Sequence, residues 1–382
     1  MVVIRGSTMS GAIDHDYIRQ NFPTLSTMTY LNNAATGIPP RSCVDAMTRF
    51  LDDRINVRGD IEEVVKTLKE VRGLLAKLQG GQEKQYGLQP NTSTGINSFA
   101  HSIEYPELSN IVLCDLEFPA NYVPWQNICR LTGAELRIAK SKNGAAPLHS
   151  FKELIDENTR VLAVSQVQFG SGFRVDLGEL ARAVHEVGGY LVADVIQAIG
   201  WADTDFKRKN VDFAAGHAAK WLLGPIGAGY VYVDDGLIDN LIPRFLGWWG
   251  VEKMEDYTYF EREPLPDAKK FEIGSPSVIG YVGMLESLKT IMEVPAQTRE
   301  QAALDNGDYL RKRLSEEGID HYDFGKKHNS PIVSCKPKNA EELNKELTKE
   351  KIHCSVRNGR LRVSPHFYNT TEEIDRLMEH LR

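Results

Sequence analysis

The sequence predicts an α/β fold in which a mostly parallel sheet is accompanied by a smaller α+β domain. Four short apolar runs through the middle of the chain are typical of strands, and helical patterns separate them. The segment "LGELARAVHEVGG" has the period of an amphipathic helix that ends at glycine. Near-continuous Val, Leu and Ile indicate strands covered on both faces. The four runs are "NIVLCDLEF", "RVLAVSQVQF", "YLVADVIQ" and "GAGYVYVD".

The smaller domain is expected after about residue 250, where the character of the sequence changes. A long charged segment, "EVPAQTREQAALDNGDYLRKRLSEEG", predicts a helix, and "SPIVSCK" and "RLRVSPHF" predict shorter strands. A terminal helix begins where Thr370 and Glu373 have capping-box spacing. We expect a segment over 1–30 that packs on the small domain, a large domain over 31–260 and a small domain over 261–382.

Composition and charge exclude several classes of protein. The chain has 382 residues, 42% of them hydrophobic, and a net charge of −7 without a sustained basic run, which disfavours nucleic acid and anionic membranes as partners. Its apolar windows are too short to span a bilayer, and "MVVIRGSTMSGAIDHDY" lacks the apolar core of a signal peptide. Five dispersed cysteines without a C-x-x-C pair favour a reducing, cytoplasmic location and no metal cluster.

Two residues at predicted strand ends could carry chemistry, because open α/β sheets bind ligands beyond the carboxyl ends of their strands. Asp194 ends "YLVADV", and Lys220 lies in the apolar stretch "GHAAKWLLGP". Separately, they fit a helix-capping aspartate and a lysine whose amine reaches the surface. Together they fit a different chemistry. A buried lysine is neutral enough to form a Schiff base, and a buried aspartate keeps a pyridine nitrogen protonated.

Two further stretches could complete such a site. "QPNTSTGINSFA" places Thr92 and Ser93 before a helical pattern, where backbone N–H groups and hydroxyls bind anions, although a plain N-cap cluster is the favoured interpretation of this stretch taken alone. In "LEFPANYVPW", Phe118 follows a strand and could stack on a flat cofactor or belong to the core.

The order of these features resembles the class V aminotransferase family of fold type I pyridoxal-phosphate enzymes, which includes cysteine desulfurases, selenocysteine lyases and isopenicillin-N-epimerase-like proteins. The resemblance implies a large domain with a mostly parallel seven-stranded sheet, pyridoxal 5′-phosphate as cofactor, and a homodimer with shared active sites. It covers nearly the whole chain, in "YLNNAATGIPP", "NTSTGIN", "FPANYVPW", "ADVIQAIGW", "HAAKWLLGP", "FEIGSPS" and "RLRVSPHFYNTTEEID".

The resemblance also implies roles toward the cofactor. Lys220 would form the Schiff base and move the α-proton, and Asp194 would pair with the pyridine nitrogen. Gln197 would contact the ring hydroxyl. Thr92 and Ser93 would hold the phosphate.

Three more cofactor contacts follow from the same resemblance. Phe118 occupies the place of the residue that stacks on the ring and assists catalysis. His217 falls where relatives often carry a phosphate-binding serine. Ser275, in "FEIGSPS", would reach the phosphate from the neighbouring subunit.

On the substrate side, Arg362 matches the arginine that clamps the α-carboxylate, a task suited to bidentate pairing. The resemblance implies Asn33 as a further substrate contact, and a polar residue that assists the carboxylate in relatives falls on Gln168 or Phe169. The chain departs from desulfurases in "KIHCSVRNGRLRVSP", which is too short for their mobile cysteine loop. Cys354 there is expected to be a structural thiol.

The overall similarity to the desulfurase and selenocysteine-lyase branch implies elimination of sulfur or selenium from a small cysteine-like amino acid. Transamination or epimerisation by the same family is the alternative, since the cysteine loop is missing. A scaffold protein that keeps the fold without activity is a third hypothesis. The retained set of Lys220, Asp194, Gln197 and Arg362 disfavours it.

Overall fold

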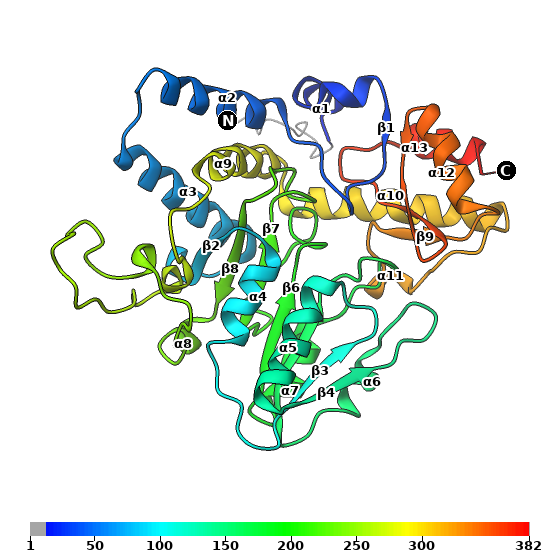
Figure 1. Ribbon diagram of the computed structural model, residues 1–382. Helices are drawn as coiled ribbons and strands as arrows, with labels where there is room; N and C mark the ends of the chain where they lie inside the picture. The colour runs from blue at the N-terminus through cyan, green and yellow to red at the C-terminus, as the bar shows by residue number, and fades with distance from the viewer. Residues whose placement is uncertain (1–12, 382) are drawn as a thin grey trace.

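The computed structural model describes residues 13–381, and its centre is a seven-stranded sheet with helices on both faces (Figure 1). Along the sheet, β8 is antiparallel to both of its neighbours, whereas the remaining adjacent pairs are parallel. The expectation of a mostly parallel seven-stranded sheet is confirmed. In spatial order the strands are β2 (Tyr86–Gln89), β8 (Gly229–Val233), β7 (Phe213–His217), β6 (Tyr190–Asp194), β5 (Thr159–Ser165), β3 (Asn110–Cys114) and β4 (Glu135–Ala139).

Alternate residues of the central strands pack into two different cores. Ile111 and Leu113 of β3 belong to a core shared with α4 (Thr92–Ala100) and α5 (Val123–Thr132). Val112 and Cys114 belong to the opposite core, which includes residues of α3 (Ile61–Gln79) and α7 (Leu177–His185). Both faces being covered explains the unbroken apolar runs in these strands. The other helices of this part are α2 (Arg41–Ile55), α6 (Leu148–Lys152), α8 (Asp235–Ile238) and α9 (Val278–Met292).

A second, smaller sheet forms in the C-terminal part of the chain. It is antiparallel, in the order β11 (Ser355–Arg357), β12 (Arg360–Val363) and β9 (Val333–Cys335). The predicted capping box is confirmed, since the Thr370 N–H donates to Glu373 Oε2 at 3.0 Å. The helices around this sheet are α10 (Ala296–Glu316), α11 (Gly325–His328), α12 (Ala340–Lys349) and α13 (Thr371–Glu379).

The N-terminal segment joins this smaller part. After α1 (His15–Asn21), β1 (Thr29–Tyr30) pairs in parallel with β10 (Ile352–His353). Leu31 then enters the core formed by α10, α12 and the small sheet. None of the helices within residues 13–381 is long and apolar enough to cross a membrane.

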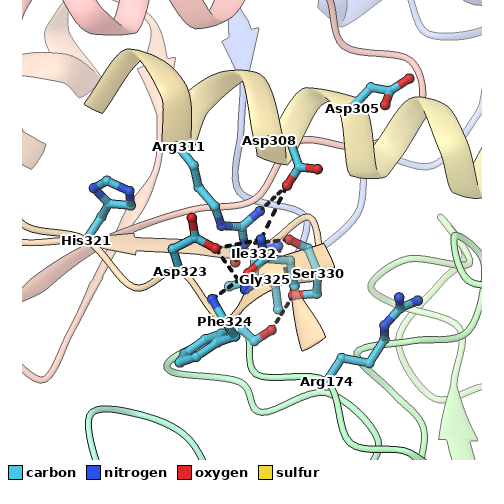
Figure 2. A network of polar contacts seen from close by, with 12 residues as sticks. Arg174, Asp305, Asp308, Arg311, His321, Asp323, Phe324, Gly325, Ser330 and Ile332 are labelled. Atoms are coloured by element: carbon cyan, nitrogen blue, oxygen red, sulfur yellow. Dashed lines mark hydrogen bonds and ion pairs between the residues drawn. The ribbon is translucent and has the colours of Figure 1, made fainter. Parts of the chain in front are cut away.

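A polar network joins the C-terminal part to a loop of the large sheet (Figure 2). The buried Arg311 donates to the Ser330 carbonyl at 2.8 Å, and Ser330 Oγ donates to the Gly172 carbonyl at 2.7 Å. Gly172 has φ +80°, and a Cβ there would lie 2.2 Å from the Ile332 carbonyl oxygen. Glycine is therefore required at this junction, which holds the loop that follows β5 against the smaller sheet.

Candidate active site

Asp194 is the last residue of β6, and its two carboxylate oxygens have different surroundings. Oδ1 accepts the Ile196 N–H at 3.0 Å, while Oδ2 is buried without a hydrogen-bond partner among the described residues. Burial, with the Glu117 charge adding to it, raises the pKa of Asp194 to about 7. Because a buried acceptor without a donor is costly, this oxygen is suited to a protonated group on a ligand.

Lys220 follows the adjacent strand β7, so its amine enters the site from the same sheet edge as Asp194. Burial, together with the cations Arg362 and Arg357, lowers the pKa of Lys220 to about 8, although the Asp194 charge opposes this shift. A large fraction of this amine is neutral near pH 8, and the neutral amine is the nucleophile that reacts with an aldehyde.

Phe118 lies beside that amine. Lys220 Nζ is 5.5 Å from the centroid of the Phe118 ring, which packs edge-on against Phe169 at 5.1 Å. The Phe118 side chain is 42% exposed, so much of its surface is free to receive a flat ligand.

Thr92 and Ser93 open helix α4, as an anion site requires. The residue that caps the helix is Asn91, whose side chain accepts the Thr94 N–H at 2.9 Å. Thr92 Oγ1 is buried without a partner within residues 13–381. The N-cap interpretation and the anion site are therefore compatible, since they use different groups of this turn.

His217 ends β7 with a neutral imidazole. Nε2 accepts the Gly227 N–H at 3.0 Å, and burial, together with Lys220, lowers the pKa of His217 to about 4. Nδ1 faces a second backbone donor, the Ala219 N–H, at 3.4 Å. Both ring nitrogens therefore contact backbone N–H groups, and the phosphate contact of His217 stays a prediction.

Gln197 is held by two neighbours of the site. Its Nε2 donates to the Ala34 carbonyl at 3.0 Å, and its Oε1 accepts the Trp221 indole N–H at 2.7 Å. The second amide hydrogen is the group left for a ligand hydroxyl.

Arg362 comes from the smaller sheet, on β12. Nη1 donates to the Phe169 carbonyl at 2.9 Å and Nε to Ser355 Oγ at 3.3 Å, while Nη2 is buried without a partner in the described chain. Burial, followed by the Arg357 charge, lowers the pKa of Arg362 to about 9. A buried guanidinium with an unused N–H edge is a site for a carboxylate.

Asn33, Gln168 and Ser275, also expected in the site, differ in their surroundings. Both ends of the Asn33 amide are used, by the Ser364 carbonyl at 3.0 Å and the Tyr368 hydroxyl at 2.6 Å. Gln168 directs its NH₂ group to Glu117 at 2.8 Å, so it offers an acceptor rather than the donor that a carboxylate needs. Ser275 is exposed. Their roles stay predictions.

Sequence reasoning missed Glu117, a buried carboxylate next to Phe118. Its oxygens accept hydrogen bonds from the Ser165 N–H at 2.9 Å, Ser165 Oγ at 2.5 Å, Gln168 Nε2 at 2.8 Å and Asn121 Nδ2 at 2.8 Å. Ser165 is the strand partner of Asp194. The available signal was an acidic residue directly before Phe118 in "LEFPANYVPW".

All five cysteines lie in the described chain, and none resembles a reactive thiolate. Burial raises the pKa of Cys335 to about 12 and that of Cys129 to about 11. It also raises the pKa of Cys354, Cys114 and Cys43. A sulfur-accepting cysteine needs a lowered pKa and exposure, so the structural interpretation of Cys354 fits its surroundings.

The unpartnered atoms fit pyridoxal phosphate and an amino acid. Asp194 Oδ2 suits a protonated ring nitrogen, Thr92 Oγ1 suits a phosphate, and Arg362 Nη2 suits an α-carboxylate. None of these three atoms has a hydrogen-bond partner within residues 13–381, and each matches one polar end of the cofactor or substrate.

Comparisons with known proteins found relatives that match most of the chain. A probable cysteine desulfurase of Methanothermobacter thermautotrophicus is 27% identical over 95% of this chain and 96% of its own. Two structures of C-DES share the fold. One is a variant with glycine covalently linked to the PLP cofactor (TM-score 0.86, 21% identity, 95% of this chain and 98% of that one). The other is the cystine C–S lyase with its product cysteine persulfide (TM-score 0.85, 22% identity, 94% and 98%).

The family profile described as "Aminotransferase class-V" matches residues 29–377, a span that includes Asp194, Lys220 and Arg362. Its enzymes use pyridoxal phosphate. The chain therefore belongs to the class-V aminotransferase family.

Proposed function

We propose that the protein is a pyridoxal-phosphate enzyme that cleaves the C–S bond, or the C–Se bond, of a cysteine-like amino acid. The observation that carries the proposal is the strand-end pair: Asp194 with an unpartnered buried oxygen, and Lys220 with its pKa lowered to about 8. The bound cofactor supplies an electron sink that makes the α-hydrogen of an amino acid acidic.

The chain's own residues then have distinct tasks. Lys220 carries the cofactor and, as a neutral amine, takes the α-proton. Asp194 keeps a proton on the ring nitrogen, and Arg362 orients the α-carboxylate through its free Nη2. Phe118 covers the reacting group beside Lys220 Nζ.

The sulfur leaves with its own substituent in this proposal. The Cβ–S bond breaks, the electron pair goes to sulfur, and the sulfur takes a proton as a thiol or persulfide. Water then releases the remaining carbon skeleton as pyruvate and ammonia. The raised thiol pKa values support this route because no cysteine of the chain is suited to accept sulfur. The cystine C–S lyase with a persulfide product is a relative whose name fits this chemistry.

The proposal is tested with purified protein and a Lys220→Ala variant. We expect a visible absorbance band that depends on Lys220, and release of pyruvate from cystine or from cysteine S-conjugates. A pyridoxamine product would instead favour transamination, and solvent deuterium at the α-carbon without pyruvate would favour epimerisation. A protein that stays colourless with added cofactor would contradict the proposal.

A homodimer and a cytoplasmic location are part of the same proposal. Ser275 is exposed, as expected for a residue that serves a neighbouring subunit, and the five cysteines are free. Sedimentation of the wild type and Ser275→Ala, with cofactor affinity measured for each, tests the shared site.

A further inference from the structure

Arg357 is a second guanidinium on the face of the small sheet that carries Arg362. The register pairs Ser355 with Arg362 and Arg357 with Arg360. Directly opposed residues of an antiparallel pair share a face, and diagonal neighbours lie about 7–8 Å apart, within reach of long side chains. Arg357 and Arg362 are such diagonal neighbours.

Arg357 has no acidic partner among residues 13–381. Its side chain makes a 2.7 Å hydrogen bond to the carbonyl of the preceding residue, Val356, which leaves most of its N–H groups unused. The neighbouring Arg360 differs, because it pairs with Asp320 Oδ2 at 2.9 Å. The half-buried Arg357 is therefore the uncommitted arginine of this strand pair.

The charges around Arg357 favour an incoming anion. Its cation is close enough to Lys220 and Arg362 to lower the pKa of both, so three cationic side chains repel one another. Arg362 is assigned to the α-carboxylate. An amino acid with a single carboxylate would leave Arg357 without a counter-charge in a partly desolvated site, which is unfavourable.

We propose that Arg357 determines specificity by binding a second carboxylate, at the far end of the substituent on the substrate's sulfur. The preferred substrates are then disulfides or thioethers of cysteine that end in a carboxylate, and this group departs with the sulfur. The identity of the broken bond rests on the proposed function, whereas binding of the second carboxylate by Arg357 can be measured without any bond being broken.

The test uses two ligands of nearly the same shape, S-carboxymethylcysteine and S-carbamoylmethylcysteine, which differ by one negative charge. Their dissociation constants are measured by calorimetry on the cofactor-loaded Lys220→Ala protein, where turnover is blocked. A charge-assisted hydrogen bond predicts that the carboxylate ligand binds about 10- to 100-fold more tightly. The substitution Arg357→Gln should bring this ratio close to one, and Arg357→Lys should retain part of it.

Arg360→Gln is the matched control, and it should keep the ratio of the parent protein. If Arg357→Gln does not fold, Arg357→Met keeps the aliphatic stem and gives the same comparison. Equal affinities in the parent protein overturn the inference, as does an unchanged ratio after Arg357→Gln. Failure of the proposed function is seen separately, as a wild-type holoenzyme that releases no pyruvate from any sulfur amino acid.

Discussion

Gly37 lies directly against the backbone of Lys220. A Cβ on Gly37 would be 1.9 Å from the Lys220 carbonyl oxygen, and the Gly37 N–H donates to the Ala219 carbonyl at 2.8 Å. The N-terminal segment therefore fixes the turn that presents the lysine. Because the contact is with a backbone atom of Lys220, no side-chain movement can remove the clash that a larger residue at position 37 would cause.

Gly37→Ala should displace this turn, destabilising the protein by about 1–3 kcal/mol and weakening cofactor capture. Thermal unfolding and the visible absorbance of the reconstituted protein measure both effects. Gly73→Ala in helix α3 is the control, since a Cβ there meets nothing within 4 Å. It should be neutral or stabilising.

Asp194→Asn should move apo stability and cofactor affinity in opposite directions. The folded-state pKa of about 7 lies above the unfolded value, so the native state binds the extra proton between about pH 4 and 7. Apo stability from this group therefore falls as pH rises through that window. At pH 8 the neutral variant should be about 2 kcal/mol more stable as apoprotein, yet bind pyridoxal phosphate more weakly. If Asp194→Asn lowered both apo stability and cofactor affinity, the role of this aspartate would be structural only.

Capture of the cofactor by the apoprotein should rise with pH around a midpoint near 8, because the neutral amine reacts and the pKa of Lys220 is lowered to about 8. Stopped-flow absorbance gives the rate at each pH. Arg357→Gln removes a nearby cation, so the midpoint should move upward. A midpoint near 10, the value for a free lysine, would contradict the buried environment.

Glu117→Gln should destabilise the protein by about 2–4 kcal/mol, because every group around this carboxylate is a donor and an added NH₂ would oppose them. It should also lower the pKa of Asp194, to which the Glu117 charge contributes. Denaturant unfolding measures the first effect, and the pH dependence of apo stability the second. The exposed Glu186→Gln serves as the reference.

Cys354→Ser should lower stability by about 1–3 kcal/mol, the cost of burying a hydroxyl, and leave turnover per bound cofactor intact. Pyruvate release and cofactor content are measured on the same sample. Cys129→Ser, at a half-buried site, should change neither stability nor turnover per bound cofactor. Loss of turnover in a fully loaded Cys354→Ser protein would instead mean that sulfur passes through this thiol.

The central strands and the strand-end pair were predictable from the sequence because burial on both faces demands long apolar runs. The strand "FAAGH" was not recognised, since its small residues lack a β-branched pattern, and the edge strand "ELRIA" is half exposed. Strands β3, β5 and β6 end at Cys114, Ser165 and Asp194, a few residues earlier than the runs from which they were predicted. The residues beyond those ends belong to turns and to the site.

The site was less predictable where a contact depends on distant segments. Glu117 meets Ser165 and Gln168 across the sheet, and the Asn33 amide is used by Ser364 and Tyr368. Such partners are set by tertiary packing, which no local spacing encodes.

The pairing of Thr29 with Ile352 has a consequence for the order of folding. A ribosome releases the first strand of the smaller domain long before its partner exists, whereas residues 86–233 supply the whole large sheet while synthesis continues. The large sheet can thus form first, and β1 must wait, with Leu31 uncovered, until β10 has been synthesised. Removal of β1 and removal of β10 should therefore damage the same domain.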